Sequence, residues 1–311
     1  MQTSSAPTRW AIALILTVGI LAVSTAAVFI RLALDAADQR GVGFSLVLAA
    51  MRMGIAALML VPTWRSFHPG QIQRRSLLYS MVAGICLAIH FASWITSLSY
   101  TSIAASTTLV TTNPIWVALL SWWIWRERPT WLTSVGIGVA IAGSAVIGLS
   151  DLGVASPGQH PLLGNALALI GSWAVSAYFL LSREAQRNGV STQHHVAITY
   201  SLAALVLIPM PWLAHTSYLG YSPRVYVYIS LMALFPQVIG HTSLNWAVRW
   251  MSPTLVTLVI LAEPVGAGLL GLVIFQEYPG PMVLLGAMIL LSGVAIAAIG
   301  NQDRPSMPSS P

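Results

Sequence analysis

The sequence has few charged residues and no lysine at all. Charged residues make up 7% of its 311 residues, and all 14 basic residues are arginines. A soluble domain carries about 25% charged residues, so this chain cannot present a polar enough surface to water. Because 56% of the residues are hydrophobic and the mean hydropathy is +0.77, the composition predicts a polytopic membrane protein.

Several kinds of chemistry are also excluded. One cysteine, Cys86, allows neither an internal disulfide nor a cysteine metal cluster. The chain has no Gly-x-x-x-x-Gly-Lys-Ser/Thr loop, which excludes a P-loop ATPase. No nucleophile–base pair stands out, so we expect neither an enzyme nor a bound cofactor or metal. The net charge of +6 comes from arginines that lie mostly in the loops on one side of the membrane, so it is a signal of topology and does not indicate nucleic-acid binding.

Long apolar segments predict an all-α membrane protein, since a span needs about 20 apolar residues. Ten segments qualify, near residues 10–33, 43–63, 76–98, 103–125, 131–150, 162–182, 193–213, 226–248, 253–275 and 281–300. The loops between them are short. Residues 301–311 form a polar tail that we expect to be disordered and cytoplasmic.

Arginine placement predicts the orientation, because cytoplasmic loops are enriched in arginine. With the N-terminus inside, the inner loops and tails hold Arg9, Arg65, Arg74, Arg75, Arg126, Arg128, Arg183, Arg187, Arg249 and Arg304. The outer loops hold only Arg40 and Arg224. Both termini are therefore expected in the cytoplasm of a cell with an inner (cytoplasmic) membrane.

The chain repeats itself at a nearly constant offset. A shift of 150 residues aligns Ser93 with Ser243, Thr107 with Thr257, Pro114 with Pro264, Glu127 with Glu277 and Gly143 with Gly293. A shift of 152 aligns Ser24 with Ser176. We predict two five-helix repeats, residues 10–150 and 162–300. Because five is odd, the second must enter the membrane inverted, as in many secondary transporters.

The phrases around the two prolines resemble a known family. Thr111–Pro114 with Glu127–Pro129, and Ala262–Pro264 with Glu277–Pro279, are similar to the EamA repeat of the drug/metabolite transporter superfamily. Within it the chain is similar to YddG-type exporters of aromatic and other neutral amino acids. The resemblance covers nearly the whole chain. It implies a basket of ten helices, with helices 1, 3, 4, 6, 8 and 9 around a central cavity and 2, 5, 7 and 10 outside.

Polar side chains follow single faces of the expected cavity helices at helical spacing. Such stripes include His90, Trp94 and Ser97 in helix 3, Gln237, His241 and Asn245 in helix 8, Ser172 and Ser176 in helix 6, and Thr107, Thr111 and Asn113 in helix 4. The residues expected to contact a substrate are Trp94, Ser97, Thr107, Asn113, Trp173, Ser176, His241, Asn245 and Glu263.

Glu263 is the strongest single candidate. It lies in the middle of the apolar run 253–275, and a carboxylate there costs roughly 2.5–3.5 kcal/mol on insertion scales. Such a group normally faces a cavity or a partner. Glu263 could bind a substrate amine or carry a proton, or it could simply be protonated and hydrogen-bonded to a neighbouring helix. His90 is a second candidate for proton coupling, with a packed, satisfied imidazole as the alternative.

Two prolines are candidate hinges. Pro114 and Pro264 each remove a helical hydrogen bond near the membrane midplane, which suits gating, although prolines also serve as ordinary kinks. Arg52, within helix 2, is expected to snorkel or pair. Gly136 and Ala140 in helix 5, with Gly293 and Ala297 in helix 10, permit close packing between the halves or between two chains.

The sequence thus predicts a secondary exporter of small metabolites, most of all neutral or aromatic amino acids, that works by alternating access. The alternative is proton-coupled efflux of hydrophobic cations. The expected partners of the protein are a small-molecule substrate and the lipid bilayer, and the chain could be a monomer or a homodimer.

Overall fold

The computed structural model describes residues 7–68, 70, 72–101, 103–126, 128–149, 160–275 and 281–302, and within them every regular element is a helix. The helices are α1 (Arg9–Ser24), α2 (Ala26–Ala37), α3 (Val42–Met59), η1 (Val61–Ser66), α4 (Arg74–Ser97), α5 (Ile103–Val110), α6 (Asn113–Trp125), α7 (Trp131–Leu149), α8 (Pro161–Arg187), α9 (Thr192–Leu207), α10 (Met210–Leu213), α11 (Pro223–Met232), η3 (Ala233–His241), α12 (Thr242–Trp250), α13 (Pro253–Ile260), α14 (Glu263–Phe275) and α15 (Pro281–Gln302).

Seven helical segments of the described chain are long and apolar enough to cross a membrane. They are Arg9–Ala37, Val42–Met59, Arg74–Ser97, Leu162–Arg187, Thr192–Leu213, Pro223–Trp250 and Pro253–Ile274. Each coincides with one of the ten expected spans. The other three expected spans are helical but shorter or interrupted: residues 103–125 form α5 and α6, and α7 and α15 contain shorter apolar stretches. The membrane class follows, while the number ten remains a prediction.

Local chemistry explains where several helices begin. The Ser191 and Ser252 hydroxyls accept hydrogen bonds from the backbone N–H groups of His194 and Leu255, 3.3 and 3.2 Å away. Both serines are N-caps, which satisfy a donor that the first helical turn leaves free. Proline occupies the first turn of α8, α11 and α13, where its missing N–H costs nothing.

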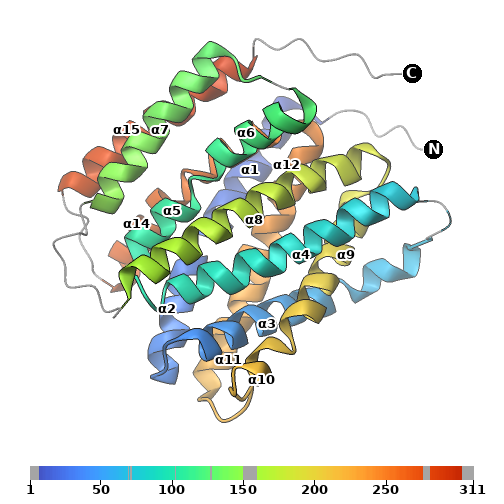
Figure 1. The fold of residues 1–311 in the computed structure, drawn as a ribbon, viewed down its shortest axis with the longest axis vertical. Coiled ribbons are helices and arrows are strands. Elements are labelled where there is room, and N and C mark those ends of the chain that lie inside the picture. The colour runs from blue at the N-terminus through green and yellow to red at the C-terminus, as the bar shows by residue number, and fades with distance from the viewer. Residues whose placement is uncertain are drawn as a thin grey trace.

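Several contacts between helices of the two halves occur in equivalent pairs. The first helical segment (α1) packs on η3 and α12, and its counterpart α8 packs on α4. Likewise α1 contacts α13 and α14, while α8 contacts α5 and α6. Two further pairs, α3 with α9 and α7 with α15, map onto themselves. In Figure 1, α7 and α15 lie side by side along one flank, and α3, α10 and α11 lie on the opposite flank.

Small residues allow the closest of these approaches. A side chain on Gly136 or Gly293 would overlap Ala297 or Ala140 of the partner helix, so α7 and α15 use their small residues within the chain. A side chain on Gly19 would press on Ser243, and one on Gly171 would press on Trp94. Gly19 and Gly171 are related by the same 152-residue shift as Ser24 and Ser176. The two crossings, α1 over η3 and α12 and α8 over α4, are therefore built alike.

Some expectations fall outside the described residues. These include Glu127 and Glu277 and residues 150–159, which run from the end of the first proposed repeat toward the second. Most of the expected tail does so as well, because α15 extends to Gln302 and the described chain ends there.

Candidate functional site

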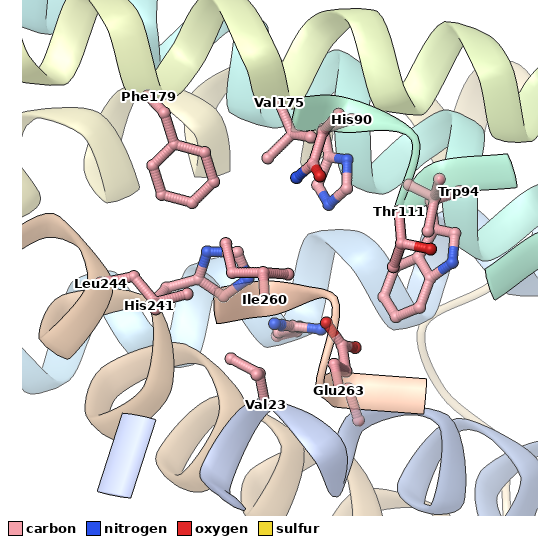
Figure 2. Close-up of a pocket in the computed structure, with 14 residues that line it drawn as sticks. Val23, His90, Trp94, Thr111, Val175, Phe179, His241, Leu244, Ile260 and Glu263 are labelled. Carbon is pink, nitrogen blue, oxygen red and sulfur yellow. The ribbon is translucent and has the colours of Figure 1, made fainter. Parts of the chain in front are cut away.

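A cavity lies among α1, α2, α3, α4, α5, α6, α8, η3, α12, α13 and α14, with about 460 Å³ of space free of protein atoms including its open mouth. Its lining is Val23, Ala26, Arg52, His90, Trp94, Val110, Thr111, Asn113, Val175, Phe179, His241, Leu244, Ile260 and Glu263. Figure 2 shows these side chains approaching from all sides of the pocket. All six expected spans that the resemblance placed around a cavity contribute to it. The second expected span, which is α3 in the structure and was expected outside the cavity, adds Arg52.

Two interrupted helices form one side of this cavity. Between α5 and α6 the helix breaks at residues 111–112, and between α13 and α14 it breaks at residues 261–262. The two breaks differ by exactly the 150-residue repeat offset. Asn113 and Glu263 are the first residues of the second half-helices, and Pro114 and Pro264 follow them. A helix N-terminus carries a partial positive charge. The N-termini of α6 and α14 therefore bring two polar stretches of backbone to the cavity in an otherwise apolar bundle.

Glu263 projects from its break toward the middle of the pocket (Figure 2). Its backbone carbonyl accepts a hydrogen bond from the Ser24 hydroxyl, 3.3 Å away on α1. The Ser176 hydroxyl on α8 donates in the same way to the backbone carbonyl of Asn113, also 3.3 Å away. The two hydrogen bonds are symmetry equivalents in the repeat. They fix the start of each half-helix while leaving the Glu263 carboxyl group on the cavity wall.

Two histidines line the cavity, His90 on α4 and His241 on η3. The His90 ring lies parallel to the Trp94 ring, with centroids 5.8 Å apart, and 6.4 Å from the His241 ring. The His90 Nδ1 atom lies 2.9 Å from the Gly171 carbonyl oxygen. Since a carbonyl only accepts, Nδ1 carries the proton, and this hydrogen bond fixes the orientation of the ring. Neither histidine is isolated, as each continues the polar wall of the pocket.

Arg52 lies inside the protein and not at its surface. Its side chain is 0% exposed, so of the two expectations, snorkelling or pairing, snorkelling is wrong. The Nε atom donates to Gln237 Oε1 at 3.0 Å, and the guanidinium carbon lies 4.1 Å from the centroid of the Phe91 ring. Arg52 thus reaches inward from α3 between α4 and η3, and it lines the cavity.

Four polar atoms of the lining are buried without a hydrogen-bond partner in the protein. They are Arg52 Nη1, Trp94 Nε1, Asn113 Oδ1 and His241 Nδ1. Buried polar atoms are nearly always satisfied, so a cluster of unsatisfied donors and acceptors around one cavity indicates a place for polar ligand atoms. The wall between them is apolar and includes Phe179, Leu244 and Ile260.

The structure places the predicted site residues in two groups. Trp94, Asn113, His241, Glu263 and His90 meet at the cavity. The remaining ones, Ser97, Thr107, Trp173, Ser176, Asn245, Pro114 and Pro264, are not part of its lining.

Local contacts account for the second group. Ser97 donates to the Trp94 carbonyl oxygen at 2.7 Å, and Asn245 donates to the Tyr178 hydroxyl and the His241 carbonyl oxygen. Trp173 is 48% exposed and packs edge-on against Trp116 at 5.3 Å. Thr107 is buried, and Ser176 holds the backbone of Asn113. These residues support the wall or face outward; their predicted contact with substrate remains untested.

Sequence reasoning missed Arg52 as a lining residue and the apolar side chain of Phe179. The polar signal for Arg52 was present, but its helix was expected outside the cavity. One local feature was also missed: residues 233–241 form a π-helix around Pro236. Such wider turns often occur at functional sites, and this one carries Gln237 and His241.

No group of three or more histidine, cysteine, aspartate or glutamate side chains is arranged to hold a metal ion among the described residues. The polar atoms gathered at the cavity belong to a guanidinium group, an indole, two imidazoles, an amide and one carboxyl group. Their chemistry suits hydrogen bonding and charge pairing with an organic ligand.

Comparison with known proteins gives a consistent result. The chain matches the EamA-like transporter family over residues 9–149 and again over residues 162–299. It is 24% identical over 275 residues to the "Uncharacterized transporter YwfM" of Bacillus subtilis, covering 83% of this chain and 86% of that protein. It is 26% identical over 328 aligned positions to a "Probable terminal-alkyne amino-acid exporter" of Streptantibioticus cattleyicolor, covering 95% and 96%.

The chain also resembles a shorter protein and a solved structure. A "Probable 4-amino-4-deoxy-L-arabinose-phosphoundecaprenol flippase subunit ArnE" of Salmonella paratyphi C is 25% identical over 107 residues, covering 34% of this chain and 96% of that protein. A solved crystal structure superposes with a TM-score of 0.73 at 16% identity, covering 96% of this chain and all of the other. At that identity the superposition speaks for the fold alone.

Proposed function

Because the chain belongs to the EamA-like transporter family of the drug/metabolite transporter superfamily, we propose that it is a secondary transporter that exports neutral and aromatic amino acids by alternating access. The proposal includes ten transmembrane helices in two inverted repeats, residues 10–150 and 162–300, in a cell inner membrane with both termini cytoplasmic. The observation that carries it is the cavity beside two equivalent helix breaks, whose lining includes buried polar atoms without protein partners.

Three features support this substrate class. Glu263 offers a carboxyl group for an amine, and the lining also supplies the Asn113 amide and His241 ring for polar contacts. The surrounding wall is apolar and includes Trp94 and Phe179, which suits an apolar or aromatic side chain. An amino-acid exporter is also among the proteins that resemble this chain over nearly its whole length.

The proposed movement uses the helix breaks. Pro114 and Pro264 follow the interrupted turns, and the half-helices beyond them would tilt as the two halves rock about the cavity. Discontinuous helices of this kind surround the substrate sites of many secondary transporters. The protein acts on a small-molecule substrate within the lipid bilayer, as a monomer or a homodimer.

A flux assay tests the proposal. Purified protein in liposomes should release labelled phenylalanine, leucine or another neutral amino acid faster than empty vesicles do. Absence of such flux for every neutral amino acid tested would remove this substrate class.

A second candidate is proton-coupled efflux of hydrophobic cations, favoured by one observation: the Glu263 carboxyl group lies in a largely apolar cavity. The discriminating measurement is flux under an imposed pH gradient in the wild type and in Glu263→Gln. Asp35→Asn is the matched control, since Asp35 is half exposed, paired with Arg40 and not among the residues that line the cavity. A cation flux that follows the gradient in the wild type and in Asp35→Asn, but not in Glu263→Gln, would favour this second function.

A further inference from the structure

Two opposite charges face one cavity without pairing. Among the residues described around the cavity, Arg52 and Glu263 are the side chains that carry formal charges. Arg52 and Glu263 do not form an ion pair with each other, unlike Arg40 with Asp35 or Arg187 with Glu184. Both charged groups line the cavity and neither neutralises the other through an ion pair.

The Arg52 side chain is held in place by contacts on only part of its guanidinium group. Gln237 binds Nε at 3.0 Å and Phe91 covers one face at 4.1 Å. Nη1 has no hydrogen-bond partner in the protein although the residue is 0% exposed. A buried charge left without a partner is strongly destabilising, so this arrangement is costly unless a ligand completes it.

The chemistry of the missing partner follows from the donor. A guanidinium group matches the two oxygens of a carboxylate in a planar, bidentate geometry. A purely cationic ligand would satisfy Glu263 and meet repulsion from Arg52. A purely anionic ligand would satisfy Arg52 and be repelled by Glu263. A ligand that carries a carboxylate and an ammonium group on the same molecule satisfies both.

We propose that Arg52 binds the carboxylate of a zwitterionic α-amino acid while Glu263 binds its ammonium group, with the substrate side chain against the apolar wall. This assignment rests on the proposed function and adds its recognition element. Arg52 then determines specificity, since it separates amino acids from amines that lack the carboxylate. Gln237 and Phe91 are positioning residues that act through Arg52.

A ligand series tests the proposal on the wild-type protein. The purified protein in detergent is titrated with L-phenylalanine, 2-phenylethylamine, which lacks the carboxylate, and 3-phenylpropanoate, which lacks the amine. The same is done with L-leucine, 3-methylbutylamine and 4-methylpentanoate, and the readout is the shift of the melting midpoint. We expect each amino acid to bind at least tenfold more tightly than either of its truncated analogues.

Variants then assign the two ends of the ligand. Arg52→Gln should lose at least tenfold in affinity for the amino acid and little for the amine, so that the two bind alike. Glu263→Gln should likewise lower the affinity for the amino acid and change that for the deaminated acid little, so that these two ligands bind alike. Arg40→Gln is the matched control, because Arg40 is half exposed and paired with Asp35, and it should keep the wild-type order.

The outcomes separate the inference from the function on which it rests. Amine binding as tight as amino-acid binding in the wild type overturns the role of Arg52, even if amino acids are transported. Absence of both binding and flux for all amino acids removes the proposed function itself. If Arg52→Gln does not fold, Arg52→Lys replaces it: loss of affinity for the amino acid but not for the amine supports the inference, and an unchanged order overturns it.

Discussion

The Ser24 hydroxyl lies 3.3 Å from the backbone carbonyl oxygen of Glu263, to which it donates a hydrogen bond. The same hydroxyl proton is shared with the Ile20 carbonyl oxygen within its own helix, 2.8 Å away. Ser176 repeats both contacts, to Asn113 at 3.3 Å and to Ser172 at 2.7 Å. Each serine thus joins the first helical segment of one half to the broken helix of the other half, and the two contacts set the height of Glu263 and Asn113 in the bundle.

The contact between α1 and α14 should be intolerant of added volume. A side chain on Gly266 would overlap the Ser24 hydroxyl, whereas Gly268 on the same helix has open space. We expect Gly266→Ala to destabilise the protein by about 1–3 kcal/mol through overpacking and to slow transport by displacing the start of α14. Gly268→Ala should leave both unchanged. Melting midpoints and liposome flux measure the two effects.

A second substitution identifies the cause of the Gly266 effect. Ser24→Gly removes the atoms that the new methyl group would meet, so it should restore most of the stability lost in Gly266→Ala. If the double variant is no more stable than Gly266→Ala alone, the overlap with Ser24 is not the cause.

The Arg52–Gln237 contact predicts a graded loss of recognition. Gln237→Glu would place a carboxylate where the amide oxygen now accepts from Arg52 Nε at 3.0 Å. The new ion pair would neutralise Arg52 and weaken its hold on a substrate carboxylate, while the fold is retained. Isothermal titration should show at least a tenfold rise in Kd for L-phenylalanine and little change for 2-phenylethylamine. Equal loss for both ligands would mean that Gln237 shapes the pocket and does not act through Arg52.

Packing of α7 against α15 gives a prediction about stability alone. A side chain on Gly136 would overlap the backbone and side chain of Ala297, while Gly138, on the other face of the same helix, has nothing within 4 Å. Gly136→Ala should lower the melting midpoint, at a cost of about 1–3 kcal/mol, and Gly138→Ala should not. Cross-linking in membranes serves as the check on the alternative: altered homodimer yield only in Gly136→Ala would place this face between chains.

The proposed inverted topology can be tested by labelling. After Cys86→Ser, single cysteines are introduced at Arg40 and at Arg187, which are exposed residues after the first helical segments of the two halves. A membrane-impermeant maleimide should label Arg40→Cys in intact cells and Arg187→Cys only after permeabilisation. Labelling of both from the same side would show that the two halves run in parallel and would rule out inverted repeats.

The sequence predicted well what depends on composition and on regular spacing. It placed seven spans that the structure describes as long apolar helices, and the 150-residue offset at Pro114 and Pro264 anticipated two equivalent positions at which helices end. It also grouped His90 with Trp94, which stack at 5.8 Å. These features follow from the helical period and from the cost of placing polar groups in an apolar bundle, and both are local properties of the chain.

The direction in which each face points was decided by tertiary packing alone. Trp173 shares a helix with Val175 and Phe179, yet it is 48% exposed while they line the cavity. Arg52 belongs to a helix expected outside, yet contacts with Gln237 and Phe91 turn its guanidinium group inward. Helical periodicity determines which residues share a face, but the rotation of that face toward the cavity depends on how close neighbouring helices can approach. Here glycines such as Gly19 and Gly171, on segments far apart in the sequence, permit that approach.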